Sequence, residues 1–441
     1  MKYTILGGGL SALSAAYFLQ QSSKISQIDI YEKEEKAGGL CRSFCIEGIK
    51  FDIGPHIIFS KDKDILELMN NFSGSNKSVY KRSNKIVLNG RLINYPFEND
   101  LSKLDKESLN YAVNTFINNP YKNYKADNML QFFYKTFGEG ITNLYLLPYN
   151  EKIWKFPPAF MDLQIIERLP APSNEDILRS AEGETVDGYL HQLYFTYPEK
   201  GGIETLIDAF KSKLSSKVHI YSNSEIVKIK KQSDNFIIKT KNGKIISAEN
   251  IISSIPLNYL AEIYESSDKP AEVIEAAKQL KYNSIIIGIV NVKKDYAGSS
   301  FAFTIPDRSV IFHRISKLDF YGSGYHIKNS ITYMIEITFR KNDVYDNMDS
   351  RELEDKIISG LKTLKFISSE KEINFIDLKK FEYAYVIYDL MHRKNTDIIK
   401  KYFEQENITL LGRFGAFEYI NMDAAIKSAM QTAENITKEL S

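Results

Sequence analysis

The chain has 441 residues and a mass of 50.6 kDa, which at about 100–200 residues per domain predicts two to four structural units or one core with a large insertion. Its 57 Lys and Arg residues balance 56 Asp and Glu residues, so the formal net charge is +1. This balance argues against a protein that holds nucleic acid by bulk positive charge, and we expect no nucleic-acid partner. A hydrophobic fraction of 43% and a charged fraction of 26% are typical of a globular chain.

The cysteine count and the apolar segments indicate the compartment. Only Cys41 and Cys45 occur, which excludes a disulfide scaffold and fits a reducing compartment. Their spacing allows a disulfide or a metal clip, but we expect two small buried residues, and no metal, because the six histidines are scattered. The N-terminus lacks the basic region of a secretory signal, and no uncharged apolar run reaches about 18 residues. We therefore expect a cytoplasmic protein without a membrane span.

In chain order, the first elements predict a βαβ unit. Residues 3–6 read as a short strand, three glycines follow, residues 10–21 have helical apolar spacing, and residues 28–32 read as a second strand. Helical patterns dominate residues 62–169. Short β runs then occupy residues 225–255, where Asn242-Gly243 indicates a hairpin turn, and a second β-rich stretch covers residues 282–339. From residue 410 the tail returns to a strand, a glycine turn and a helix.

The glycine turn in the first unit has the spacing of a dinucleotide-binding fingerprint. Gly7 permits a tight turn after the strand, Gly9 lets the backbone approach a pyrophosphate, and Ala12 allows close packing of helix on strand. The pyrophosphate would lie at the N-terminus of the helix, where backbone N–H groups favour an anion. Glu32, at the end of the second strand, is placed to accept hydrogen bonds from a ribose 2′-hydroxyl. The alternative is a glycine turn in an unrelated α/β fold.

The segment after Glu32 favours FAD over NAD. Gly38-Gly39 allows a second backbone segment to lie close to a diphosphate, and Arg42 could neutralise it. Residues 51–56, Phe-Asp-Ile-Gly-Pro-His, then offer a tight turn that could face a flat ring. With these motifs the sequence resembles the flavin-containing amine oxidase and protoporphyrinogen oxidase superfamily, whose cofactor is FAD.

The order of the elements predicts an α/β fold with a doubly wound, Rossmann-like FAD-binding domain. We expect this domain to be discontinuous, built from residues 1–60, 195–275 and 395–441. Residues 61–194 would form a mainly helical substrate or cap region, and residues 276–394 a β-rich substrate region.

Blocks spread over nearly the whole chain make a narrower resemblance. The most specific are Tyr149-Asn-Glu-Lys-Ile-Trp154 and the tail from Gly412 to Asp423, with residues 166–170, 194–198 and 383–388 between them. In this order they resemble the UDP-galactopyranose mutase family. The resemblance implies that reduced FAD, for which NAD(P)H is an option as reductant, attacks the anomeric carbon of a nucleotide sugar and interconverts pyranose and furanose without net redox change.

The resemblance also implies which residues contact substrate and cofactor. Catalytic candidates on the substrate side are His56, Arg168, Tyr385 and Tyr419, and candidates for substrate binding are Trp154 and Tyr194. Arg314 in the β-rich region is a further candidate for substrate binding, which the resemblance does not itself imply. Each has a structural alternative: a core tryptophan, a surface ion pair for Arg168, a strand end for Arg314, a loop histidine, or a structural tyrosine. The cofactor residues would be Gly7, Gly9, Leu10, Ser11, Ala12, Glu32, Lys33, Gly39, Leu40, Arg42, Gly54, Pro55, His56, Val227, Gly412, Arg413, Asn421, Met422 and Ala425.

Several positions depart from the mutase pattern. Pro172 stands where the pattern has an arginine that grips the substrate diphosphate, Phe59 where it has a second histidine, and Phe417-Glu418 where it has Tyr-Arg. Arg314 could supply the missing arginine, and the substrate could differ from UDP-galactose or not be a nucleotide sugar. The alternative function is an FAD-dependent oxidoreductase that moves a hydride from substrate to flavin; a third is a non-enzymatic FAD-stabilised scaffold. The oligomeric state is open, with a homodimer as one option.

Overall fold

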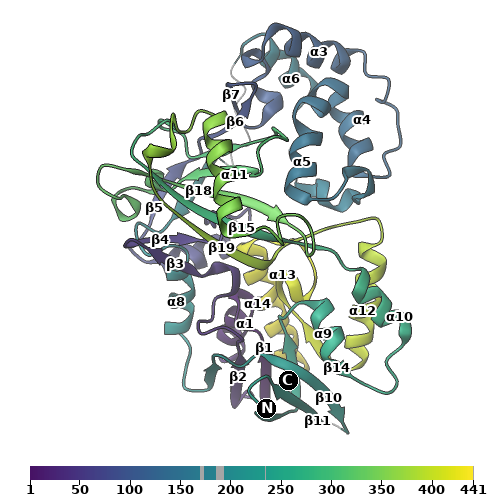
Figure 1. Cartoon of the computed structure of the whole chain (residues 1–441). Coiled ribbons are helices and arrows are strands. Elements are labelled where there is room, and N and C mark those ends of the chain that lie inside the picture. Colours follow the sequence, from purple (N-terminus) through teal and green to yellow (C-terminus); the bar gives the residue numbers. More distant parts are fainter. Residues whose placement is uncertain (169–172, 185–192, 234, 441) are drawn as a thin grey trace.

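The computed structural model describes residues 1–441 except 169–172, 185–192, 234 and 441. Three sheets dominate it, with five, four and seven strands. In Figure 1 a group of helices lies at the end of the molecule opposite the two chain termini, and the longest strands lie between that group and the N-terminal strands. This confirms the predicted α/β class.

The five-stranded sheet is parallel throughout and contains the predicted βαβ unit. Its order is β20 (Ile408–Leu410), β13 (Asn250–Ser253), β1 (Lys2–Leu6), β2 (Gln27–Tyr31) and β9 (Val218–Tyr221). Four of the five residues in each of β1 and β2 are buried, as expected for a parallel sheet covered on both faces. The helices that pack with this sheet are α1 (Leu10–Leu19), α2 (Lys63–Ser73), α8 (Glu204–Ser212) and α14 (Met422–Glu439).

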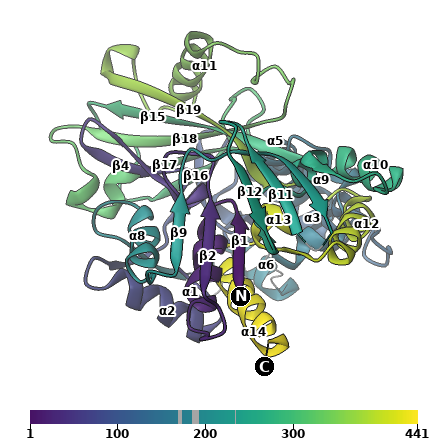
Figure 2. The ribbon, with the colours of Figure 1, turned by 90° about the horizontal axis from the view of Figure 1, so that it is seen from below.

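A smaller sheet lies beside the parallel one (Figure 2). Its strands, in order, are β12 (Ile245–Ala248), β11 (Asn235–Thr240), β10 (Ile226–Gln232) and β14 (Tyr264–Glu265). The Asn242-Gly243 turn joins β11 to β12 as an antiparallel hairpin, and Gly243 adopts a φ of +89° there. The neighbouring helices are α9 (Leu257–Ile263), α10 (Ala271–Gln279) and α12 (His392–Gln405).

The seven-stranded sheet joins residues 61–194 and 276–394, which the sequence predicts to form two separate regions. Its order is β19 (Ile373–Val386), β15 (Tyr282–Val292), β18 (Ile331–Phe339), β17 (Arg314–Lys317), β16 (Ala302–Thr304), β6 (Asn84–Leu88) and β7 (Arg91–Asn94). Strands β6 and β7 come from within residues 61–194, where helical patterns dominate, and β6 pairs in parallel with β16. Helix α11 (Ser350–Thr363) packs on this sheet through apolar side chains.

The remaining elements are two short sheets and the helical group. The short sheets pair β3 (Ser43–Ile46) with β4 (Ile49–Asp52), and β5 (Ser78–Lys81) with β8 (Tyr194–Tyr197). The helical group contains α3 (Lys106–Ile117), α4 (Met129–Ile141), α5 (Leu147–Trp154) and α6 (Asn174–Ala181); a single turn, α13 (Gly412–Gly415), precedes α14. Gly140 lets α4 approach α3 closely, since a Cβ there would lie 2.6 Å from the Cα of Ala112.

The three stretches predicted to build the cofactor domain supply every strand of the parallel sheet: β1 and β2, then β9 and β13, then β20. The domain boundaries themselves stay a prediction. One expectation is wrong: Cys41 is buried, but Cys45 is exposed. Cys45 lies two residues after the buried Ser43, but at this end of the β3–β4 hairpin the side chain faces outward.

Candidate functional site

The glycine turn after β1 packs against the second glycine segment. Gly7 has a φ of +87°, and its N–H donates to the carbonyl of Tyr31 on β2 (2.8 Å). The carbonyl of Gly8 accepts from the N–H of Gly38 (2.8 Å), and a Cβ on Gly39 would lie 3.1 Å from the Cα of Gly9. The two backbones therefore lie in close contact, which a side chain on Gly39, whose φ is +57°, would disturb.

Glu32 closes one side of this turn. The carboxylate is buried, with 6% of the residue exposed. One carboxylate oxygen accepts from the N–H of Gly8 (2.6 Å) and the other from the N–H of Glu34 (2.9 Å). A carboxylate fixed at the end of β2 is suited to bind the hydroxyls of a ribose.

A cavity of about 730 Å³ opens over these segments. Most of the predicted cofactor residues line it: Gly7, Gly9, Leu10, Ser11, Glu32, Lys33, Gly39, Leu40, Arg42, His56, Gly412, Arg413, Asn421, Met422 and Ala425. Four predicted residues are not among the lining residues: Ala12, Gly54, Pro55 and Val227. Ala12 is fully buried in the core, and on β10 the neighbouring Ile226 lines the cavity in place of Val227.

The chemistry of the lining fits an FAD diphosphate. Helix α1 starts at the cavity without a side-chain cap on its N-cap residue Gly9, and α14 starts there without a side-chain cap from its N-cap residue Asn421. Open helix N-termini favour anions. Gly412, with a φ of +83°, brings the tail turn onto the first turn of α1, since a Cβ there would lie 2.6 Å from Oγ of Ser11. Arg42, held by the carbonyl of Gly39 (3.0 Å) and paired with Glu34 (3.4 Å), adds a guanidinium to the lining.

Three predicted substrate-side aromatics come together from α5, β19 and the segment before α14. The ring of Trp154 is edge-on to Tyr385 (centroids 6.1 Å apart) and to Tyr419 (5.6 Å), and the two tyrosine rings are 5.6 Å apart. The Trp154 indole N–H donates to Oδ1 of Asn150 (3.0 Å). The guanidinium carbon of Arg413, a cavity residue, lies 5.1 Å from the centre of the Tyr419 ring. None of the three rings is among the residues that line the cavity, and Trp154, 5% exposed, packs in the hydrophobic core, so the cluster reaches the cavity through Arg413.

His56 lines the cavity in its neutral form. Its Nδ1 lies 3.0 Å from the carbonyl oxygen of Gly54. Because a carbonyl only accepts hydrogen bonds, Nδ1 carries the proton and Nε2 is left as an acceptor. Burial, followed by the nearby charge of Arg413 and then that of Arg314, lowers the pKa of His56 to about 4. The residue therefore acts as an acceptor at neutral pH.

Arg314, at the start of β17, pairs with a carboxylate that the sequence analysis misses. Glu336 on β18 is fully buried, and both of its oxygens bind the Arg314 guanidinium, with Nη2 to Oε2 at 2.6 Å. The available signal was a single charged residue inside the apolar run of β18. Since Glu336 neutralises its charge, Arg314 is a weaker candidate than expected for gripping a substrate diphosphate.

For two other predicted residues, Tyr194 and Arg168, the structure does not test the predicted contact with a substrate. Tyr194 begins β8 opposite Lys81, is 56% exposed, and is not among the residues that line the cavity. Arg168 ends a 3₁₀ segment, Leu163–Arg168, but its side chain lies outside the described part of the chain. Pro172 also lies outside the described residues. The roles given to these residues stay predictions.

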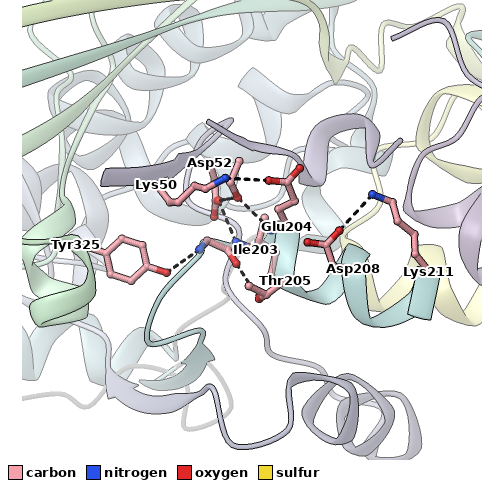
Figure 3. A network of polar contacts seen from close by, with 10 residues as sticks. Lys50, Asp52, Ile203, Glu204, Thr205, Asp208, Lys211 and Tyr325 are labelled. Atoms are coloured by element: carbon pink, nitrogen blue, oxygen red, sulfur yellow. Dashed lines mark hydrogen bonds and ion pairs between the residues drawn. The ribbon is translucent and has the colours of Figure 1, made fainter. Parts of the chain in front are cut away.

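A buried carboxylate fixes the strand that leads to His56 (Figure 3). Asp52, at the end of β4, accepts from Ser43 Oγ (2.5 Å), the Tyr197 hydroxyl (2.6 Å) and the N–H of Ile203 (3.0 Å). Burial raises the pKa of Asp52 to about 6, in spite of these donors. The network ties β4 to the start of α8, where Gly202 donates its N–H to the Tyr325 hydroxyl (3.0 Å). It thereby holds the Gly54–His56 turn against the cavity.

Within the ranges that the structure describes, no helix is both long and apolar enough to cross a membrane.

Comparison with known proteins gives a family and a fold. Residues 10–437 match the family of flavin containing amine oxidoreductases. A protoporphyrinogen oxidase of Dictyostelium discoideum is 22% identical over 378 residues, 70% of each chain. The structure of a reduced UDP-galactopyranose mutase superposes with a TM-score of 0.91 and 23% identity, covering 100% of this chain and 96% of that one. Putrescine oxidase bound to putrescine gives a TM-score of 0.68 at 15% identity, covering 99% of both chains.

Proposed function

Since the chain belongs to the family of flavin containing amine oxidoreductases, we propose that it is an FAD-dependent isomerase that interconverts the pyranose and furanose forms of a nucleotide-linked sugar. It acts in the cytoplasm on a small-molecule substrate. The glycine segments and the N-terminus of α1 would hold the FAD diphosphate, and the aromatic cluster would orient the sugar.

The observation that carries this proposal is the aromatic cluster of Trp154, Tyr385 and Tyr419 beside the cavity. Aromatic rings bury the apolar C–H face of a sugar, and tyrosine hydroxyls exchange hydrogen bonds with its oxygens. Burial raises the pKa of Tyr385, so its hydroxyl keeps its proton and can donate. A surface of aromatic rings suits an uncharged sugar ring, which is oriented by packing and hydrogen bonds and not by ion pairs.

Bound and reduced, FAD supplies a nucleophile at N5, next to which the sugar must be held. The chain orients both partners. Arg413 donates to the carbonyls of Ala384 (3.0 Å) and Ile420 (2.7 and 2.9 Å), so it ties β19 to the tail and fixes the Tyr419 ring. His56 presents a neutral Nε2 as an acceptor for a substrate hydroxyl. Packed rings from three elements exclude water from the sugar side.

The test is an anaerobic screen of nucleotide sugars with the dithionite-reduced protein, read by chromatography of the sugar products. Turnover of one nucleotide sugar to a ring isomer, with the oxidised protein inactive, is the expected result. The matched variant is Trp154→Phe, which keeps an aromatic ring but removes the bond to Asn150, and should lower turnover while FAD content stays unchanged. Absence of any isomerised product across the panel would overturn the proposal.

The second candidate is an FAD-dependent oxidoreductase that takes a hydride from its substrate. The similarity to a protoporphyrinogen oxidase over 70% of the chain favours it. This activity requires an acceptor to reoxidise the flavin, so it predicts turnover in air with peroxide release and no need for a nucleotide. An oxygen electrode and a peroxide assay with the same substrates separate the two functions.

A further inference from the structure

Arg82, between β5 and β6, has an unusual environment for a cation. The side chain is partly buried, and its Nε and Nη2 atoms are buried without a hydrogen-bond partner among the described residues. Its guanidinium carbon lies 5.7 Å from the centre of the Phe59 ring. The backbone is well held, since the Arg82 N–H donates to the carbonyl of Leu193 (2.7 Å). The fold thus fixes the backbone of Arg82 but leaves its Nε and Nη2 donors without a partner among the described residues.

No carboxylate compensates this charge within the described part of the chain. The groups that act on Arg82 are Tyr95, Arg314 and Tyr321, and burial together with the charge of Arg314 lowers the pKa of Arg82. Arg314 has its own carboxylate in Glu336. The buried Tyr321 hydroxyl likewise has no hydrogen-bond partner among the described residues. The site therefore combines several donors with a surplus positive charge.

An unpaired buried charge destabilises a protein and is usually offset by a partner. The planar guanidinium fork matches the two oxygens of a carboxylate or a phosphate. A ligand that brings an oxyanion would satisfy Nε and Nη2 together.

Arg82 is not among the residues that line the cavity over the glycine segments; it lies beside Phe59 and near Arg314. Arg314 links the two places: it acts on Arg82, its charge also lowers the pKa of His56, and its Nη2 is 4.0 Å from where a Cβ of Gly54 would be. Phe59, which faces Arg82, follows His56 by three residues.

We propose that Arg82 binds an oxyanion of the substrate, a phosphate or a carboxylate, on the His56 side of the cavity. The inference rests on the proposed function only in taking the anion to be part of the substrate. It gives the substrate an anchor that does not depend on an arginine at position 172.

Two small probes, pyrophosphate and malonate, distinguish a phosphate from a carboxylate as the oxyanion. Pyrophosphate and malonate are titrated separately, by calorimetry, into FAD-saturated wild-type protein, Arg82→Met and Arg340→Met. Arg340 is a matched control because it is also partly buried but has Asp343 and Asp389 as neighbours. We expect at least one probe to bind the wild type, to bind Arg82→Met about tenfold or more weakly, and to bind Arg340→Met as it binds the wild type.

Thermal unfolding separates binding from a structural role. Without an anion, Arg82→Met should melt at or above the wild-type temperature because it removes an unpaired buried charge; a marked drop would overturn the proposal. If Arg82→Met does not fold, Arg82→Lys keeps the charge and loses the fork, and wild-type affinity in that variant would overturn it. If only pyrophosphate binding depends on Arg82, the oxyanion is a phosphate. If only malonate binding depends on Arg82, it is a carboxylate.

Equal affinity of wild type and Arg82→Met, or no binding of either probe to the wild type, overturns the anion site. If the sugar screen fails while anion binding still depends on Arg82, the mutase function is refuted but the anion site remains.

Discussion

Replacing Gly9 by valine should strongly weaken FAD binding without disturbing the fold. Gly9 precedes α1 with a φ of −73° and a ψ of 178°, an extended conformation open to any residue. A Cβ at this position meets only the Cα of Gly39, at 3.9 Å, which is ordinary van der Waals contact. Since Gly9 lines the cavity, the valine side chain would project into the space over the N-terminus of α1.

The magnitude follows from the contacts that the valine blocks. A diphosphate seated at the start of α1 takes hydrogen bonds from backbone N–H groups, and a bond to a charged group contributes about 1.5–3 kcal/mol. Losing two such bonds weakens FAD binding by about 3 kcal/mol or more, on the order of a hundredfold. Gly9→Ala, with a smaller side chain, should fall between valine and wild type.

The assay is titration of apoprotein with FAD, followed by quenching of flavin fluorescence, beside thermal unfolding of the same apoproteins. Gly39→Ala is the contrasting variant, because Gly39 has a φ of +57° and its Cβ would lie 3.1 Å from the Cα of Gly9. That variant should lower the unfolding temperature of the apoprotein, whereas Gly9→Val should not. Wild-type FAD affinity in Gly9→Val would refute the reasoning.

Three further predictions concern titration and reactivity. The pKa of Asp52 is raised from 3.8 to about 6, so the native state holds this proton more tightly than the unfolded chain; its stabilising contribution is complete below pH 3.8 and is lost as pH rises through 6. At about 1.4 kcal/mol per pKa unit, and with part of the contribution already lost at pH 4, urea unfolding at pH 4 and pH 7 should show about 2.4 kcal/mol more loss in wild type than in Asp52→Asn; an identical pH dependence would contradict this. His56, with its pKa lowered from 6.5 to about 4, stays neutral from pH 5 to 9. Wild type and His56→Gln should therefore have pH profiles of kcat/KM with the same shape near pH 6.5. Iodoacetamide should label the exposed Cys45 and spare the buried Cys41, whose pKa burial raises to about 12; peptide mass spectrometry that finds both alkylated in native protein would refute this placement.

Sequence reasoning found the parts of the site that are local along the chain. The strand, glycine turn and helix around Gly9, the acid at Glu32 and the hairpin at Asn242-Gly243 each depend on conformational limits of a few neighbouring residues. For the same reason, the predicted cofactor residues near the glycine segments line one cavity.

The tertiary structure decided which aromatic side chains meet near the cavity. Trp154, Tyr385 and Tyr419 meet only because α5, β19 and the tail converge, and no spacing in the sequence encodes the distance between them. The Arg314–Glu336 pair and the pairing of β6 with β16 are likewise contacts between distant segments.

The sequence by itself determined the dinucleotide-binding unit, because glycine conformations and strand–helix periodicity are properties of short stretches. Burial and contacts with distant segments decided which arginine has a carboxylate partner. Arg314 pairs with Glu336, whereas Arg82 has no carboxylate partner among the described residues and is left for a ligand. Electrostatic compensation is a property of the packed interior, so only the tertiary structure could assign it.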